Sequence, residues 1–206
     1  MRWVRDTTGR FLERPHYDVE EMDDQCESII SAFMHKKYGE VRYPITTNDL
    51  VILLEQETSD VDHYAELDDD VEGVTHFLHD RLPTVQIATH LTTDARREVR
   101  LRTTLTHELG HVKLHRFLWS FGQLSLFDVT PRPPTCNRDS VHGFTNTDWM
   151  EWQARFASGA FLMPITALRR TVQDVRDGLS WPFGSSARAS SGQSPGHHPW
   201  TQEVHS

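Results

Sequence analysis

The stretch from Thr104 to His115 constrains the fold of this chain more than any other. It reads TLTHELGHVKLH, and its apolar residues recur at the three- and four-residue spacing of a helix. One face of that helix carries Leu101, Leu105, Leu109 and Val112. Leu114 and Leu118 fall near the opposite side. Because both flanks carry large apolar side chains, the pattern predicts a central helix that is buried on both sides.

The same helix carries a pattern typical of zinc sites. His107 and His111 are one turn apart, so their imidazoles lie about 40° apart around the axis and can hold one tetrahedral ion. Glu108 projects about 100° from His107, which suits a general base for the water that zinc activates better than a third ligand. With 13 histidines in 206 residues, the pattern arises by chance in about one such sequence in twenty. A third ligand is needed to decide.

The third ligand is not another histidine of the common extended motif. In that motif a glycine and a histidine follow the second ligand, but this chain has Leu114 and Phe117 at those positions. The alternative is a carboxylate from a later helix. Glu151 opens EWQARFASGAFLMP, a predicted helix whose small residues at 154–160 would allow close approach. The competing interpretation is that Glu151 only favours the first turn of its own helix through the helix dipole.

Apolar spacing and stop signals outline the rest of the chain. Helices are expected at about 19–38, from a cap at Thr47 or Asn48 onward, from a cap at Asp94 through the histidine motif, at about 148–163, and from there to about 178. Strands are expected at 71–79 and 84–91. Residues 1–17 are expected to be a loose lead-in. Residues 179–206 are rich in Ser, Gly and Pro, which predicts a disordered tail.

Charge and composition exclude several classes of protein. The net charge is −9 with only three lysines, so the chain lacks the basic stripe of a nucleic-acid binder. Cys26 and Cys136 are far apart, which excludes a zinc ribbon and favours unpaired thiols in a reducing compartment. No apolar stretch reaches the ~18 residues of a membrane span. A soluble, cytoplasmic protein that binds neither membrane nor nucleic acid is expected.

The two quoted helices, in this order, resemble the ImmA/IrrE family of zinc metallopeptidases. Its members pair an HELGHxxLH-like helix with an ExxAxxFAxxLLMP-like helix, and TVQIATHLTTDARREVR is similar to the family's edge strand and its lead-in. The resemblance covers roughly residues 20–170. It implies a metallopeptidase domain at 18–178 with a zincin-like α+β fold. In such a fold a small antiparallel or mixed sheet packs on a central HExxH helix and a second ligand-bearing helix.

The resemblance also implies a site and an activity. His107, His111 and Glu151 would hold Zn²⁺, and Glu108 would be the catalytic glutamate. The implied activity is a zinc endopeptidase that cuts a helix-turn-helix repressor of a mobile element or stress response. The aromatic residue of ARFASGAFLMP stands one place earlier than in many members, and the gap between His111 and Glu151 is longer.

Three questions stay open at the level of sequence. A binding module that keeps the metalloprotease fold with weak catalysis, as an antitoxin-like or regulatory partner, is the second hypothesis. The donor that stabilises the oxyanion is unassigned, with His142 and His115 as candidates, although His115 suits a position behind the ligands or on the surface better. The strand at 84–91 is either a place where an extended substrate adds as a further strand or an ordinary edge strand.

Overall fold

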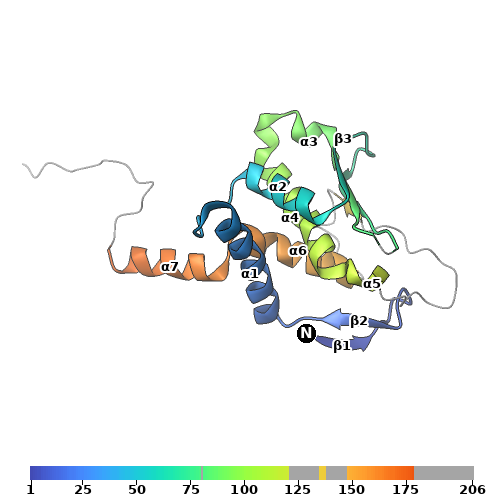
Figure 1. Cartoon of the computed structure of the whole chain (residues 1–206), viewed down its shortest axis with the longest axis horizontal. Helices are drawn as coiled ribbons and strands as arrows, with labels where there is room; N and C mark the ends of the chain where they lie inside the picture. The colour runs from blue at the N-terminus through green and yellow to red at the C-terminus, as the bar shows by residue number, and fades with distance from the viewer. Residues whose placement is uncertain (80, 121–134, 138–147, 179–206) are drawn as a thin grey trace, which may run out of the picture. The chain divides into compact units, whose positions relative to one another are not determined.

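A computed structural model describes residues 1–79, 81–120, 135–137 and 148–178 of the chain (Figure 1). Its elements are β1 (Arg2–Arg5), β2 (Glu13–His16), α1 (Val19–Tyr38), α2 (Thr47–Glu57), β3 (Asp60–Ala65), β4 (Val71–His76), β5 (Thr84–Ala88), α3 (Thr89–Thr92), the 3₁₀ turn η1 (Ala95–Arg97), α4 (Glu98–His115), α5 (Phe117–Ser120), β6 (Thr135–Asn137), α6 (Trp149–Leu162) and α7 (Ile165–Arg176). Met1–Arg170 forms one compact unit, and a second begins at Thr171. The predicted tail at 179–206 lies outside the described residues.

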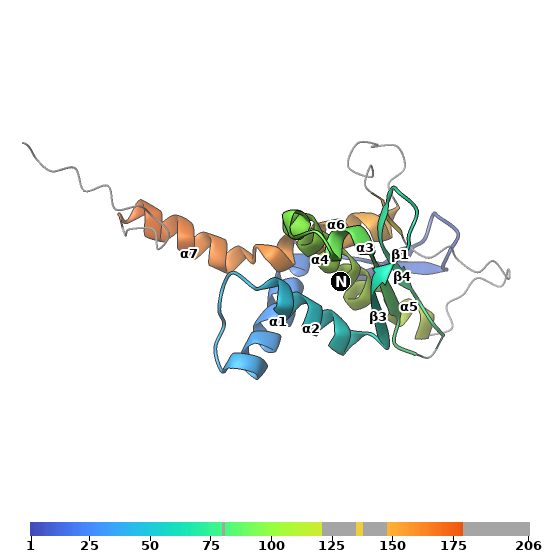
Figure 2. The ribbon, with the colours of Figure 1, turned by 90° about the horizontal axis from the view of Figure 1, so that it is seen from above.

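The described strands form two small sheets. The larger has the order β3-β5-β4-β6, with β3 parallel to β5 and the other pairs antiparallel. The smaller pairs β1 with β2. Helices α1, α2 and α4 gather to one side of β3 and β4 (Figure 2), which confirms the predicted α+β class with a mixed sheet. No helix in the described part of the chain is both long and apolar enough to cross a membrane.

The strand predicted at 84–91 is an interior strand, so its expected place at an edge is wrong. β5 bonds to β3 on one side and to β4 on the other, and strand addition by a substrate has no free edge there. The strand also ends at Ala88, where the chain turns into α3. The error comes from β3, whose sequence DVDHYA has too many charged residues to give a strand signal.

The predicted central helix is confirmed. Every residue of α4 between Thr104 and His115 is buried except Lys113. Leu105, Leu109 and Val112 pack into the main core with residues of α1 and β5. Leu114 is fully buried in the same core, and Leu118, which lies in α5, is fully buried in a second apolar cluster. The helix itself begins at Glu98, because Asp94 caps the short η1 turn that precedes it.

The other predicted helices differ from expectation only at their ends. α1 covers the predicted range and stops at Gly39, whose φ of 75° is the left-handed conformation that glycine favours. α2 has Thr46 as its cap, one residue before the earlier of the two predicted positions, and the Thr46 hydroxyl accepts the Asp49 N–H. Cys26 of α1 is a free, buried thiol.

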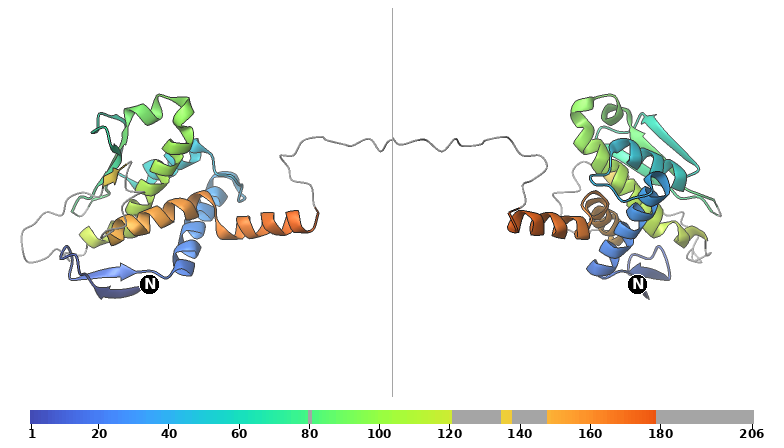
Figure 3. Two further views of the ribbon diagram at one scale, coloured as in Figure 1. Left: turned by 180° about the vertical axis from the view of Figure 1, so that it is seen from behind. Right: turned by 60° about the vertical axis from the view of Figure 1, so that its left-hand side comes forward.

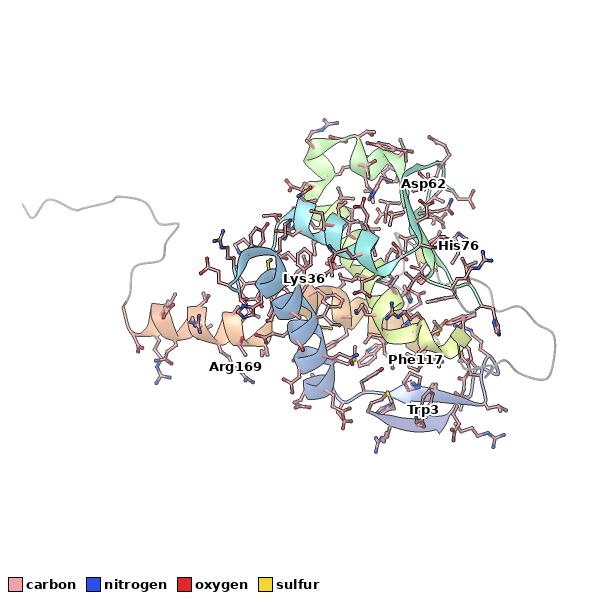
Figure 4. The ribbon with its side chains drawn as sticks, viewed as in Figure 1. Trp3, Lys36, Asp62, His76, Phe117 and Arg169 are labelled. Carbon is pink, nitrogen blue, oxygen red and sulfur yellow. The ribbon has the colours of Figure 1, made fainter. Side chains whose placement is uncertain are left out.

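Residues 1–17 form a hairpin that is part of the fold, which corrects the expectation of a loose lead-in. Phe11 and Tyr17 are buried. Trp3 packs edge-on against Phe117 of α5, with ring centroids 5.8 Å apart (Figure 4). The strand sequences RWVR and ERPH lack the apolar alternation of a half-buried strand. Aromatic contacts with distant parts of the chain, such as that of Trp3 with Phe117, hold these two strands in place instead.

Helices α4 and α6 lie side by side (Figure 3) because small residues line their contact. A Cβ placed on Gly110 would lie 3.0 Å from Ala154 Cα and 3.2 Å from Ala157 Cβ. Thr106 Oγ1 and Ser158 Oγ are 2.8 Å apart across the same contact. The close approach predicted from the small residues of α6 is confirmed, although Gly159 has no neighbour within 4 Å of its would-be Cβ.

We predict opposite effects for alanine at the two helical glycines. Gly110→Ala pushes the backbone of α4 away from the backbone of α6 and should lower the free energy of unfolding by about 1–3 kcal/mol. Gly159→Ala adds a methyl in open space to a helix and should raise the free energy of unfolding by about 0.5–1 kcal/mol. Urea denaturation followed by circular dichroism measures both. Equal effects at the two positions would contradict the proposed close contact.

Candidate metal centre

Three side chains from two helices point their ligand atoms at a common space. His107 Nε2 and His111 Nε2, both on α4, are 3.1 Å apart. Glu151, in the first turn of α6, places Oε2 3.2 Å from His107 Nε2 and Oε1 3.4 Å from His111 Nε2. These residues form the group in the described part of the chain that could hold a metal ion. The carboxylate predicted from α6 therefore does reach the two imidazoles.

The spacing of these atoms fits a tetrahedral metal ion. Ligands about 2.0–2.1 Å from a zinc ion, at tetrahedral angles, are roughly 3.3–3.4 Å from one another. The two imidazole nitrogens are 3.1 Å apart, and they lie 3.2 and 3.4 Å from the two different oxygens of the Glu151 carboxylate, all close to that value. Among the described residues, two histidines and one carboxylate are the candidate ligands, and a set of three leaves a fourth position open, as catalytic zinc sites do and structural ones do not.

Electrostatics keep Glu151 in the form that a metal ligand requires. Burial acts to raise its pKa, but hydrogen bonds from His107 and His111 outweigh burial and hold the pKa well below the usual range of a glutamate. Burial also acts to lower the pKa of His111, yet the carboxylates of Glu151 and Glu108 raise it overall. Both shifts favour an ionised Glu151 carboxylate beside positive charge.

Glu108 stands apart from the ligand group and faces the sheet. Its Oε2 accepts a 2.6 Å hydrogen bond from Thr75 Oγ1 of β4, and its Oε1 is buried without a hydrogen-bond partner among the described residues. A Cβ on Gly73 of β4 would lie 2.6 Å from Oε1, so only glycine leaves room for the carboxylate. Burial raises the pKa of Glu108. Both β4 residues were missed from sequence, because nothing in VEGVTH marks them.

His115 lies behind His111. Its Nδ1 is 3.1 Å from His111 Nδ1, its Nε2 is 3.0 Å from Gln153 Oε1, and the Trp149 ring packs edge-on against it. Burial lowers the pKa of His115 well below the usual value of histidine. With both ring nitrogens engaged, His115 has no free donor for an oxyanion. The other candidate donor, His142, lies outside the described residues.

Comparison of the chain with protein families, curated proteins and solved structures gave no match. The assignment of this site therefore depends on its own geometry and on the sequence motifs that form it.

We predict that each molecule binds about one zinc ion and that Glu151 is needed for this binding. Glu151→Ala should weaken zinc binding by more than about 100-fold, beyond the 10–100-fold typical of groups that only support a ligand. His90→Ala, in α3 and outside the ligand group, is the matched control and should bind as the wild type does. Elemental analysis after dialysis and competition with a chromophoric chelator measure both. A Glu151→Ala protein that keeps its zinc would exclude the carboxylate as a ligand.

Proposed function

We propose that this chain is a zinc-dependent endopeptidase related to the ImmA/IrrE metallopeptidases. The observation that carries the proposal is that the ligand atoms of His107, His111 and Glu151 converge. The buried carboxylate of Glu108, the residue that follows His107 on α4, accompanies them. The order of the two motifs along the chain supports the family assignment. Zinc suits a set of two imidazoles and one carboxylate with an open position.

In this proposal each side chain has a separate task. Zinc in such a set supplies Lewis acidity, which makes water a better nucleophile near neutral pH and polarises a carbonyl oxygen. No residue in the described part of the chain hydrogen-bonds to Glu108 Oε1, which suits this oxygen to take a proton from the attacking water and pass it to the leaving amine. Thr75 holds the other oxygen, Oε2, in place.

The proposed substrate is a protein, namely a helix-turn-helix repressor of a mobile element or stress response. This part rests on the resemblance to the ImmA/IrrE family. The chain would act on the repressor and not on DNA, which agrees with its net charge of −9. The repressor encoded nearest to the gene for this chain is the first substrate to test.

We predict that Glu108→Gln abolishes cleavage of the co-expressed repressor and leaves zinc binding unchanged. The amide keeps the shape of the side chain but cannot take up the proton. Glu98→Gln, at the exposed start of the same helix, is the control and should cleave normally. Immunoblotting of the repressor and zinc analysis of the purified protein measure the two properties. Cleavage by Glu108→Gln would refute the mechanism. A zinc-loaded wild type that binds the repressor without cutting it would favour the binding-module hypothesis.

We also predict that the Thr75 hydroxyl orients the general base. Thr75→Val removes the hydrogen bond to Glu108 with little change in volume and should lower kcat by about 10–100-fold at unchanged zinc content. Thr75→Ser keeps the hydroxyl and should lose much less activity. If the two variants were equally impaired, packing at residue 75 would matter and the hydroxyl would not.

A further inference from the structure

A chain of buried hydrogen bonds runs from the N-terminal hairpin to one of the ligands. The carbonyl oxygen of Pro15, in β2, accepts a 3.0 Å hydrogen bond from Gln153 Nε2. Gln153 Oε1 is 3.0 Å from His115 Nε2, and His115 Nδ1 is 3.1 Å from His111 Nδ1. His111 and His115 have no exposed surface, and Gln153 is 2% exposed.

The Pro15 carbonyl determines which atom donates and which accepts in every hydrogen bond of this series. A carbonyl oxygen can only accept, so the amide nitrogen of Gln153 must face Pro15 and its oxygen must face His115. His115 Nε2 is then a donor. The ring nitrogens of His115 meet no carboxylate among the described residues. A fully buried imidazole in such surroundings is neutral, so its single proton leaves Nδ1 as an acceptor. His111 Nδ1 must therefore donate.

The result determines which nitrogen of His111 is available to a metal. With the proton on Nδ1, the lone pair of His111 is on Nε2, the atom that lies 3.4 Å from Glu151 Oε1. The opposite tautomer would put a hydrogen into the space between the ligands. Which ring nitrogen binds a metal is generally set by the hydrogen bond of the other.

We propose that Gln153 and His115 are positioning residues that hold His111 in the Nδ1–H tautomer, with the Pro15 carbonyl as their anchor. The inference rests on the proposed metal site and deepens it. Neither residue touches the substrate or the ion. Their contribution is a ligand lone pair that is already correctly placed before the ion arrives.

Two substitutions at His115 separate this role from simple packing. His115→Leu removes the acceptor for His111 and should weaken zinc binding by about 10–100-fold. His115→Gln provides an amide oxygen for His111 and an amide nitrogen for Gln153, and should restore affinity to within roughly threefold of the wild type. Chelator competition on the full-length proteins measures both, and circular dichroism checks folding. Wild-type affinity in His115→Leu, or equal losses in the two variants, would overturn the proposal.

A spectroscopic measurement on the unmodified protein tests the same inference without a variant. Long-range ¹H–¹⁵N correlation spectra of the chelator-treated full chain, at a pH where its imidazoles are neutral, identify the protonated nitrogen of each ring. We expect the proton of His111 on Nδ1 and that of His115 on Nε2. A proton on Nε2 of His111 would refute the proposal that Gln153 and His115 hold this ring in the Nδ1–H tautomer. If the wild type binds no zinc but shows the expected tautomers, the proposed function is wrong and the positioning role of Gln153 and His115 is supported.

Discussion

The contact between Gly110 of α4 and the backbone of α6 is the constraint on which the site depends. Gly110 precedes His111 directly and follows His107 by three residues, and Ala154 follows Glu151 by three. The absence of a side chain at 110, where a Cβ would lie 3.1 Å from the Ala154 carbonyl oxygen, therefore brings the ligands of both helices together. Any side chain there would separate the carboxylate from the imidazoles, whose present separations are 3.2 and 3.4 Å.

The buried polar side chains of helix α4 have partners on two different elements. His107 and His111 face α6, Glu108 faces Gly73 and Thr75 of β4, and His115 faces Gln153. Each buried polar group needs a partner, and these partners come from two elements, α6 and β4. The sheet supports the proposed base, α6 supplies a ligand, and the N-terminal hairpin supplies the carbonyl that ends the hydrogen-bond chain. This explains why so polar a helix can lie in the centre of the fold.

The parts of this arrangement that sequence could predict are those with a local signature. Histidine spacing on one helix face, the small residues of α6 and the first-turn position of Glu151 are all visible in the sequence, and they led to the three residues that converge. Gly73, Thr75 and Gln153 could not be found in this way, because their roles depend on which strand or helix lies opposite. The hairpin at 1–17 and the strand DVDHYA were missed for a related reason: long-range pairing orders them despite poor local patterns.

The hydrogen bond from Gln153 to Pro15 has a consequence for the order of events during synthesis. It joins a residue from the beginning of the chain to one near the end of the compact unit, and all three candidate metal ligands lie between them in the sequence. Until α6 has left the ribosome, the histidines of α4 have neither their carboxylate nor the support behind His111. The complete set of three candidate ligands can therefore form only after nearly the whole unit has been translated.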